Sequence, residues 1–231
     1  MRFQHSDEIW SRYPGLAAGV VHASGVTGDA SVDAQVEKFG SIARTRLADG
    51  PEAEFPEIRA WRRTFTSMGL KATQYRCASE SLLRRFRKEG TLPRIHPVID
   101  LCNAVSVAFA IPVGVFDVAE VAGSLEVRTA RGDEEYLTFG GATERPEPGE
   151  VIFADEAGNA HARRWTNRQS GRSAVRPATS SILVVTEGMH DSAAADVAEL
   201  VAVVADELAR VWPVTPRTAL LSASAPRFDL G

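Results

Sequence analysis

The spacing of apolar side chains predicts that the first half of the chain is mostly helical and that the second half is rich in strands. An apolar run bracketed by glycines predicts a buried strand near residues 15–23. Apolar residues then recur at helical spacing over residues 31–50, with Ser31 as the candidate cap, and again over residues 54–70. Two helices are therefore expected to follow the first strand.

A third helix is expected from Ser79 to Gly90. The Ser79 hydroxyl can cap free N–H groups of the first turn, and Gly90 can adopt the left-handed conformation that often ends a helix. Leu82, Leu83 and Phe86 fall on one side and should be buried. The basic residues of this helix are then left facing outward.

A fourth helix, over residues 97–109, is apolar on nearly every side, which is typical of a helix surrounded by protein. Asp100 and Asn103 are the polar exceptions. Because an unsatisfied buried polar group costs about 1–3 kcal/mol, they should either hydrogen-bond to nearby backbone or line a polar pocket. Arg94 is a candidate partner that would hold Asp100 as part of the scaffold.

Beyond Gly114 the chain consists of short β-rich runs separated by Gly, Asp and Pro turns. The sequence DEAGN at residues 155–159 has the composition of a hairpin turn, with arms at residues 150–154 and 160–165. These runs predict a sheet that forms most of the second half of the chain.

The last predicted element is an amphipathic helix from Asp191 to Trp212, whose apolar stripe would cover the sheet. The tail, residues 213–231, has no pattern that predicts an element. Together the elements predict an α+β fold: a single domain over residues 1–231, with a central, mostly antiparallel or mixed sheet flanked by helices.

Composition excludes several classes of protein. The chain has 231 residues, of which 44% are hydrophobic and 24% charged, as in a folded globular protein. It has no apolar run long enough to span a bilayer and no signal-peptide core, so we expect a cytoplasmic protein without a membrane partner. Two cysteines and five scattered histidines give no metal-ligand spacing, so neither a metal nor a cofactor is expected.

The net charge of −4 means that contact with a polyanion would depend on local basic clusters. One cluster lies at residues 84–88 and the other at residues 163–176. The alternative is that they are a solvated helix face and a charged loop.

The segment RIHPVIDLCNAVSVAFAIPVGVFDVAEVAGSLEVRTARGDEEYLTFGG, residues 94–141, resembles a known family. It is similar to the B3/B4 editing domain of the phenylalanyl-tRNA synthetase β subunit, in which an N-x-V-V-D-x-T-N-Y helix leads to G-Q-P-M-H-A-F-D and a G-x-I-x-V-R strand. GLKATQYRCASESLLRRFRKEGTLPR, residues 69–94, is similar to freestanding proteins of this family. The resemblance is strongest over residues 69–188 and implies a freestanding B3/B4 domain.

The resemblance implies a deacylase that acts in trans on a mischarged tRNA. Such an enzyme hydrolyses the ester between a wrong amino acid, aromatic or non-protein, and the 3′-terminal adenosine. The tRNA 3′ end would be the partner, and DNA would not. Position by position, the family's pocket asparagine falls on Asn103, its neighbouring threonine on Cys102 and its histidine on Gly114. The glutamate that reads a tyrosyl hydroxyl has Glu187 as its nearest carboxylate, whereas an ungapped alignment places it nearer Val185.

A site follows from these matches. An activated ester needs only a positioned water and donors for the developing oxyanion, so the absence of an evident nucleophile is compatible with hydrolysis. Asn103 is the catalytic candidate, which would orient the water or the substrate amine, and Asp100 would hold the pocket wall in place. The candidate pocket-mouth residues are Tyr75, Arg76, Ser79 and Glu80, and the candidate RNA-binding residues are Arg84, Arg85, Arg164, Trp165, Asn167 and Arg168.

Several alternatives stay open. Ser79 and Glu80 fit a simple helix cap with a first-turn charge, and Trp165 fits a core plug. Cys102 and Gly114 depart from the family pattern, so tyrosine specificity does not follow from the resemblance. Whether the chain is an enzyme is therefore open, because a non-catalytic module that binds RNA, a nucleoside or an amino acid has the same fold. The sequence gives neither the amino acid, the tRNA nor the oligomeric state.

Overall fold

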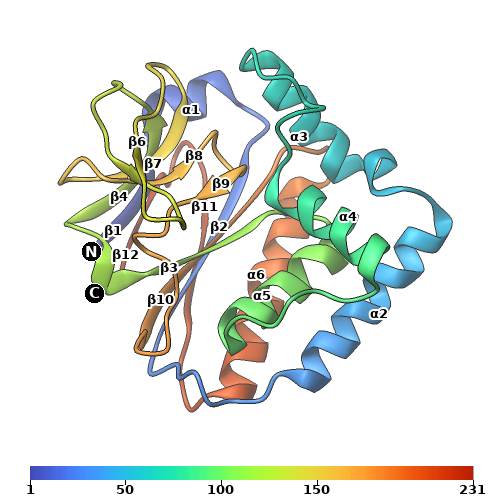
Figure 1. Ribbon diagram of the computed structural model, residues 1–231. Coiled ribbons are helices and arrows are strands. Elements are labelled where there is room, and N and C mark those ends of the chain that lie inside the picture. Colours follow the sequence, from blue (N-terminus) through green and yellow to red (C-terminus); the bar gives the residue numbers. More distant parts are fainter. Residues whose placement is uncertain (231) are drawn as a thin grey trace.

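The computed structural model describes residues 1–230 and arranges them in three layers: helices, a four-stranded sheet and a six-stranded sheet (Figure 1). The helices are α1 (Asp7–Arg12), α2 (Asp33–Asp49), α3 (Pro56–Ser67), α4 (Ala78–Glu89), α5 (Pro97–Phe109) and α6 (Ala193–Val211), with short 3₁₀ turns at Glu52–Glu54 and Val118–Glu120. The strands are β1 (Arg2–His5), β2 (Ala17–Ser24), β3 (Val113–Asp117), β4 (Ser124–Thr129), β5 (Tyr136–Leu137), β6 (Thr143–Glu144), β7 (Val151–Asp155), β8 (Ala160–Arg163), β9 (Arg168–Gln169), β10 (Ser181–Gly188), β11 (Arg217–Leu221) and β12 (Arg227–Asp229).

The four-stranded sheet is the middle layer. Its order is β11-β2-β10-β3 and all its pairs are antiparallel. Because side chains alternate along a strand, successive residues of each strand point to opposite faces of this sheet. On β10, Ile182 and Val184 join the core cluster of the helices, whereas Leu183 and Val185 join the cluster of the six-stranded sheet. Both faces are covered, so these strands are apolar throughout.

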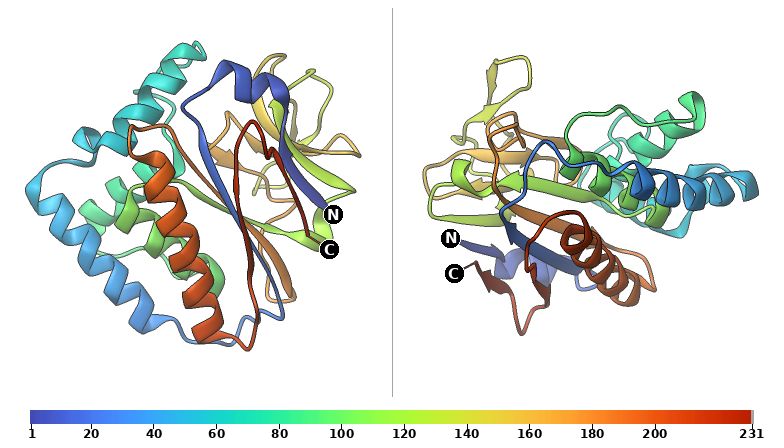
Figure 2. Two further views of the ribbon diagram at one scale, coloured as in Figure 1. Left: turned by 180° about the vertical axis from the view of Figure 1, so that it is seen from behind. Right: turned by 90° about the horizontal axis from the view of Figure 1, so that it is seen from below.

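Helices α5 and α6 cover one face of the middle sheet, and α2 packs against α5, as the two further views show (Figure 2). At Gly19 on β2, an added Cβ would lie 2.4 Å from a methyl carbon of Val201 on α6. A glycine is therefore required at this position for α6 to pack directly against the strand.

The six-stranded sheet covers the other face. Its order is β12-β1-β4-β7-β8-β9, and β1 and β4 form its parallel pair. The sheet joins both ends of the chain, because β1 pairs with β12 and Phe3 lies opposite Phe228. Strands β5 and β6 form a separate two-stranded hairpin.

The predicted α+β class is confirmed, with the strands divided between sheets. The predicted strand near residues 15–23, the hairpin around residues 155–159 and the helices over residues 31–50, 54–70, 97–109 and 191–212 all appear with bounds shifted by a few residues. Gly90 ends α4 with a φ of 75° as expected. No helix within residues 1–230 is long and apolar enough to cross a membrane.

Two predicted helix caps are wrong. Helix α2 begins at Asp33 without a side-chain cap bond, and the Ser31 hydroxyl donates instead to the Asp33 carboxylate. Helix α4 begins at Ala78, one residue before the predicted cap Ser79, which is fully buried beside the Cys77 thiol. In both cases the chain enters the helix one or two residues away from the serine.

The ends of the chain contain elements that the sequence pattern did not predict. Strand β1 and helix α1 precede the first predicted strand, and the tail after residue 213 supplies β11 to the middle sheet and β12 to the six-stranded sheet. These strands are short and mostly exposed on one side, so their periodicity is too weak to detect.

Replacing Phe228 by alanine is expected to lower the free energy of unfolding by about 3 kcal/mol, because its ring is buried between the terminal strands and the core. Urea denaturation measures the change. Phe139→Ala is the control, since Phe139 is 73% exposed and its loss should change stability by no more than about 0.5 kcal/mol. Equal effects of the two substitutions would contradict the placement of β12 in the sheet.

Candidate functional site

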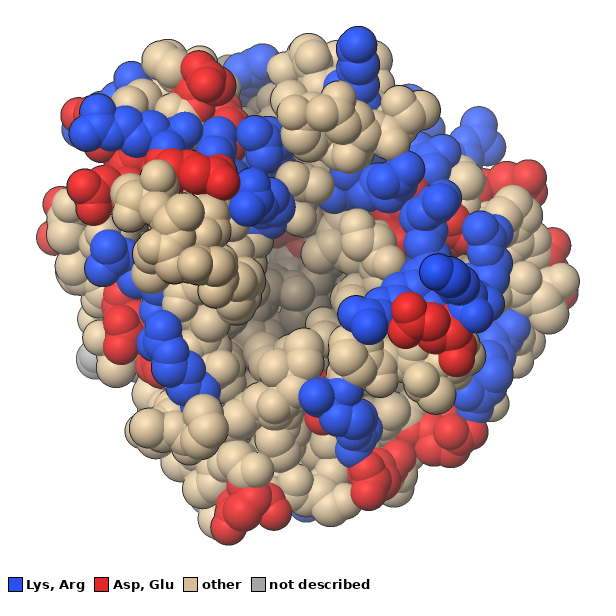
Figure 3. Space-filling model, viewed as in Figure 1, with Lys and Arg blue, Asp and Glu red and all other residues tan. Residues whose placement is uncertain are grey.

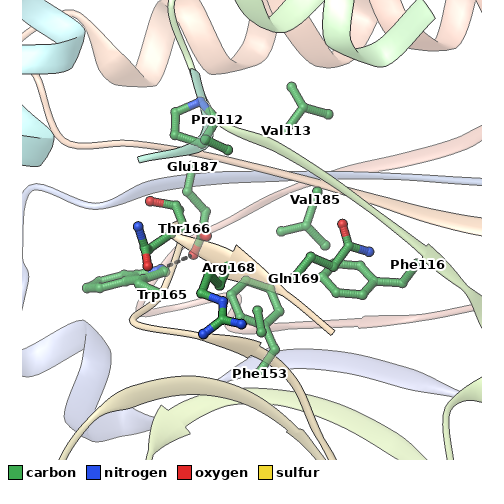
Figure 4. Close-up of a pocket in the computed structure, with 14 residues that line it drawn as sticks. Pro112, Val113, Phe116, Phe153, Trp165, Thr166, Arg168, Gln169, Val185 and Glu187 are labelled. Atoms are coloured by element: carbon green, nitrogen blue, oxygen red, sulfur yellow. Dashed lines mark hydrogen bonds between the residues drawn. The ribbon is translucent and has the colours of Figure 1, made fainter. Parts of the chain in front are cut away.

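A small pocket lies between the two sheets, close to the N-terminus of α4. The close-up shows its side chains converging from β3, β10 and the segment that follows β8 (Figure 4). The lining residues are Ala78, Pro112, Val113, Gly114, Phe116, Phe153, Ala162, Trp165, Thr166, Asn167, Arg168, Gln169, Val185 and Glu187.

Strand alternation decides which residues of β3 and β10 reach this pocket. Gly114 and Phe116 share one face of β3, and Val185 and Glu187 lie on the same face of the neighbouring strand β10. Gly114 lies directly opposite Val185 in the pairing of the two strands. The wall is thus apolar along most of its length and ends at one carboxylate.

Glu187 is 2% exposed and is the buried charged group of this wall. Its Oε1 atom accepts hydrogen bonds from His5 Nε2 at 2.7 Å and from Trp165 Nε1 at 2.9 Å. A buried carboxylate is tolerated only where donors replace its lost hydration. Its other oxygen, Oε2, accepts no side-chain or backbone hydrogen bond found among residues 1–230 and is available to a bound molecule.

Trp165 is fully buried and is held in an unusual backbone conformation. Arg164 and Trp165 have φ values of 48° and 58°, in the left-handed region that non-glycine residues rarely adopt. The backbone N–H of Trp165 donates to the carbonyl of Val151 at 2.7 Å. The indole ring packs edge-on against the rings of Tyr13 and Trp61, with ring centres 4.7 Å and 5.2 Å apart. Such strain persists only where the surroundings fix it, and it is concentrated at functional sites.

Two segments tied to each other form the pocket mouth: residues 75–78 before α4 and residues 164–167 after β8. The Ala78 N–H donates to the Thr166 carbonyl at 2.8 Å, and Asn167 Nδ2 donates to the Arg76 carbonyl at 2.7 Å. The Arg164 guanidinium lies 4.7 Å from the centre of the Tyr75 ring. The mouth is therefore a pair of hydrogen-bonded segments with cationic groups at its edge.

The lining has few groups able to perform chemistry. None of the fourteen lining residues in the described part of the chain is a serine, cysteine or histidine. Gln169 is engaged through Nε2, which donates to the Val115 carbonyl at 2.5 Å. The Thr166 hydroxyl oxygen is buried without a hydrogen-bond partner among residues 1–230. The other polar side chains of the lining are Asn167, Arg168 and Glu187.

Gly114 leaves limited extra room. An added Cβ would lie 3.2 Å from the ring of Phe116, which stacks in turn on Phe153 at 5.4 Å. The aromatic pair therefore occupies part of the space beside Gly114.

The structure brings many of the sequence-predicted site residues together. Lining the pocket are Gly114, Trp165, Asn167, Arg168 and Glu187, and the mouth contains Tyr75, Arg76 and Arg164. The interpretation of Trp165 as a core plug is confirmed by its full burial, yet it also lines the pocket.

The α5 residues lie away from this lining. Cys102 is 1% exposed and belongs to the core cluster on the helix side of the middle sheet. Asp100 accepts from the Ile95 N–H at 2.8 Å and pairs with Arg94 at 3.3 Å, which is the predicted scaffold role. Asn103 is partly exposed on the same helix and is not among the lining residues, so its catalytic role stays a prediction.

The remaining candidates form ion pairs around α4. Glu80 is fully buried and pairs with Arg62 at 2.6 Å and Arg76 at 3.3 Å, and this hydrogen bond to Glu80 raises the pKa of Arg62. Ser79 is buried beneath it, away from the lining. Arg84 pairs with the buried Glu52 at 3.3 Å, and Arg85 pairs with Glu89 at 2.9 Å on the exposed surface of the helix.

Sequence reasoning missed part of the lining. Phe116 was detectable, since it lies two residues from the predicted site residue Gly114 on the same face of β3. Thr166 and Gln169 lie in the basic segment that the sequence singled out. No sequence pattern indicated His5 as a site residue, because only the fold brings β1 to Glu187.

Positive charge gathers around the hollow on this face of the molecule. Figure 3 shows a depression with uncharged walls and with Lys and Arg side chains along much of its rim. Arg168 at the edge is 43% exposed and shares Glu144 with Arg163. Within residues 1–230 no three His, Cys, Asp or Glu side chains are grouped so as to hold a metal ion.

Comparison with known proteins places the chain among sequences related to a tRNA ligase subunit. Residues 60–215 match the B3/4 domain family. The chain is 36% identical over 76 residues to the phenylalanine–tRNA ligase beta subunit of Cereibacter sphaeroides, covering 33% of this chain and 9% of that protein. It is 37% identical over 79 residues to the same subunit of Bradyrhizobium diazoefficiens, covering 34% and 10%. The chain thus spans about a tenth of the length of these relatives.

A solved structure shares the fold. An N-terminal fragment of the phenylalanyl-tRNA synthetase beta subunit from Pyrococcus horikoshii superposes with a TM-score of 0.50 and 10% sequence identity. The similarity covers 93% of this chain and 50% of that chain. It therefore extends to most of the residues outside the 60–215 match.

Both cysteines are expected to be unreactive in the folded protein. Burial raises the pKa of Cys77 to about 11 and that of Cys102 to about 12, so neither forms the thiolate that attacks electrophiles. A chromogenic disulfide reagent at pH 8 should release no colour from native protein and two equivalents after unfolding. A rapid release from the native protein would contradict this assignment.

Proposed function

The chain belongs to the B3/4 domain family, and from that membership we propose that it is a trans-acting aminoacyl-tRNA deacylase. Its substrate is a mischarged tRNA that carries an aromatic or non-protein amino acid. The curated relatives are named as beta subunits of a phenylalanine–tRNA ligase, which supports a substrate of the tRNA class.

The observation that carries the proposal is the buried carboxylate at the end of an apolar pocket. Phe116, Phe153 and Val185 form walls that suit a flat apolar side chain, and Glu187 Oε2 can accept a hydrogen bond from a polar group at its tip. A site with one such acceptor discriminates strongly between side chains with and without a matching donor, because an unmatched partner leaves a buried group unsatisfied.

The mouth of the pocket suits the single-stranded 3′ end of a tRNA. Arg164 and Arg168 can make charge-assisted bonds to phosphates, and the Tyr75 ring beside Arg164 offers a stacking surface for a base. The hydrogen-bonded segments at the mouth would hold these groups in place before the RNA binds.

Hydrolysis in this pocket uses water as the nucleophile. Water adds to the ester carbonyl carbon and the bond from that carbon to the ribose oxygen breaks. One proton of the water goes to the ribose oxygen, the other is released to solvent, and the amino acid leaves as a carboxylate. The chain contributes position: the pocket holds the side chain, and α4 directs its positive end toward the mouth at Ala78.

A non-catalytic binding module is the second candidate function. The observation that favours it is the lining without a serine, cysteine or histidine side chain in the described part of the chain, together with Gly114 at the position of the family's histidine. Binding of an aminoacyl-tRNA without cleavage would select this alternative.

Purified protein is expected to cleave at least one ester in a panel of tRNAs charged with tyrosine, phenylalanine and non-protein aromatic amino acids. Glu187→Gln, which removes the charge but keeps an acceptor, should slow the preferred ester by roughly 10- to 100-fold, the range of a charged hydrogen bond. Release of labelled amino acid at fixed tRNA concentration measures the rate.

Glu207→Gln is the matched control for this experiment. Glu207 is also a buried carboxylate, 4% exposed, but it lies on α6 and pairs with Lys38. Its replacement should leave cleavage unchanged. The deacylase proposal fails when no ester in the panel is cleaved faster than in buffer.

Binding of tRNA is expected to weaken with salt, and the dependence should become shallower when Arg164 and Arg168 are both replaced by alanine. Each lost contact to a single-stranded phosphate should reduce the slope of log affinity against log salt by about 0.7. The control is Arg227→Ala, because β12 lies at the edge of the six-stranded sheet opposite β9. An unchanged slope in the double variant would exclude these arginines from the RNA contact.

A further inference from the structure

The N-terminal strand supplies a side chain that reaches the pocket carboxylate. His5 lies at the end of β1, its side chain is fully buried, and its Nε2 lies 2.7 Å from Glu187 Oε1. The two residues are 182 positions apart in the chain. The pair therefore joins the six-stranded sheet, which contains β1, to the middle sheet, which contains β10.

The imidazole is fixed on several sides. The Phe3 ring meets it edge-on at 5.3 Å, and the Trp10 ring packs against it at 5.0 Å. His5 Nδ1 is buried without a partner among residues 1–230, so the contact with Glu187 is the polar interaction of this ring in the described structure. The titratable and charged group that faces the imidazole is Glu187 itself.

Both donors on Glu187 meet the same oxygen. His5 and Trp165 approach Oε1 from different elements, β1 and the segment after β8. Two directional bonds to one oxygen fix the rotation of the carboxylate, and the position of Oε2 is then determined. With Trp165 alone, the carboxyl group could turn about its terminal bond, which has a broad rotational preference.

From this geometry we infer that His5 is a positioning residue of the pocket, which fixes the Glu187 carboxylate so that Oε2 selects the aminoacyl side chain. The selection of an aminoacyl side chain rests on the proposed function, but the positioning of the carboxylate is a property of the pocket. His5 lies outside residues 60–215, so the N-terminal segment completes a site whose other members lie within the family match.

The test compares variants of two buried histidines in the full chain. His5→Leu removes the donor, and His5→Gln keeps a side-chain N–H at a similar reach. His161→Leu is the matched control, because His161 is also fully buried and also pairs with a carboxylate, that of Asp155 at 3.2 Å, outside the pocket. His5→Asn, whose amide is too short to reach Glu187, replaces His5→Leu if the leucine variant does not fold.

The primary readout is the indole N–H resonance of Trp165 in a protein labelled at tryptophan nitrogen, assigned by its loss in Trp165→Phe. This proton donates to the oxygen that His5 also contacts. His5→Leu should shift the resonance and His5→Gln should restore most of the shift. His161→Leu should leave it in place even though it also lowers stability in urea.

Deacylation gives the second readout. His5→Leu should reduce the preference among the esters of the panel by roughly 10-fold, the loss of one charge-assisted bond, with little change for the least polar ester. An unshifted Trp165 resonance in His5→Leu, or an equal shift in His161→Leu, overturns the inference. When the wild-type protein cleaves no ester, the deacylase proposal fails and the indole resonance still decides the role of His5.

Discussion

The alternation of side chains along β10 is the constraint on which the rest of the structure depends. The strand is covered on both faces, so Ile182 and Val184 must pack against helices while Leu183 and Val185 pack against the second sheet. A shift of one residue in its pairing would exchange the two sets and bring the Glu187 carboxylate into the helix core. The register of the middle sheet therefore fixes the position of the pocket.

The pocket in turn depends on how a buried charge is satisfied. Glu187 is 2% exposed, and its burial requires donors from elements distant in the chain, His5 on β1 and Trp165 after β8. Trp165 reaches this position only through two consecutive left-handed residues. The cost of that backbone strain is offset by full burial of the indole and by its bond to the carboxylate.

The sequence predicted the helices and strands whose periodicity is strong, and the resemblance to the family indicated Gly114 and Glu187, which both line the pocket. The predictions from the sequence were less successful where the direction of a side chain decides its role. Asp100 and Cys102 share a helix with Asn103, but the first binds the backbone of Ile95 and the second is inside the helix-side core. A polar residue on an apolar helix can bind nearby backbone or be buried in the core, and periodicity alone cannot distinguish the two.

By itself the sequence determined the α+β class, most helix and strand positions and the family, because local spacing and a contiguous motif are properties of neighbouring residues. Only the tertiary structure decided that the two ends of the chain pair as β1 and β12 and that His5 meets Glu187. Such contacts join residues far apart in the chain through the order and register of the strands. That order is fixed by burial of both faces of the middle sheet, which no short segment specifies.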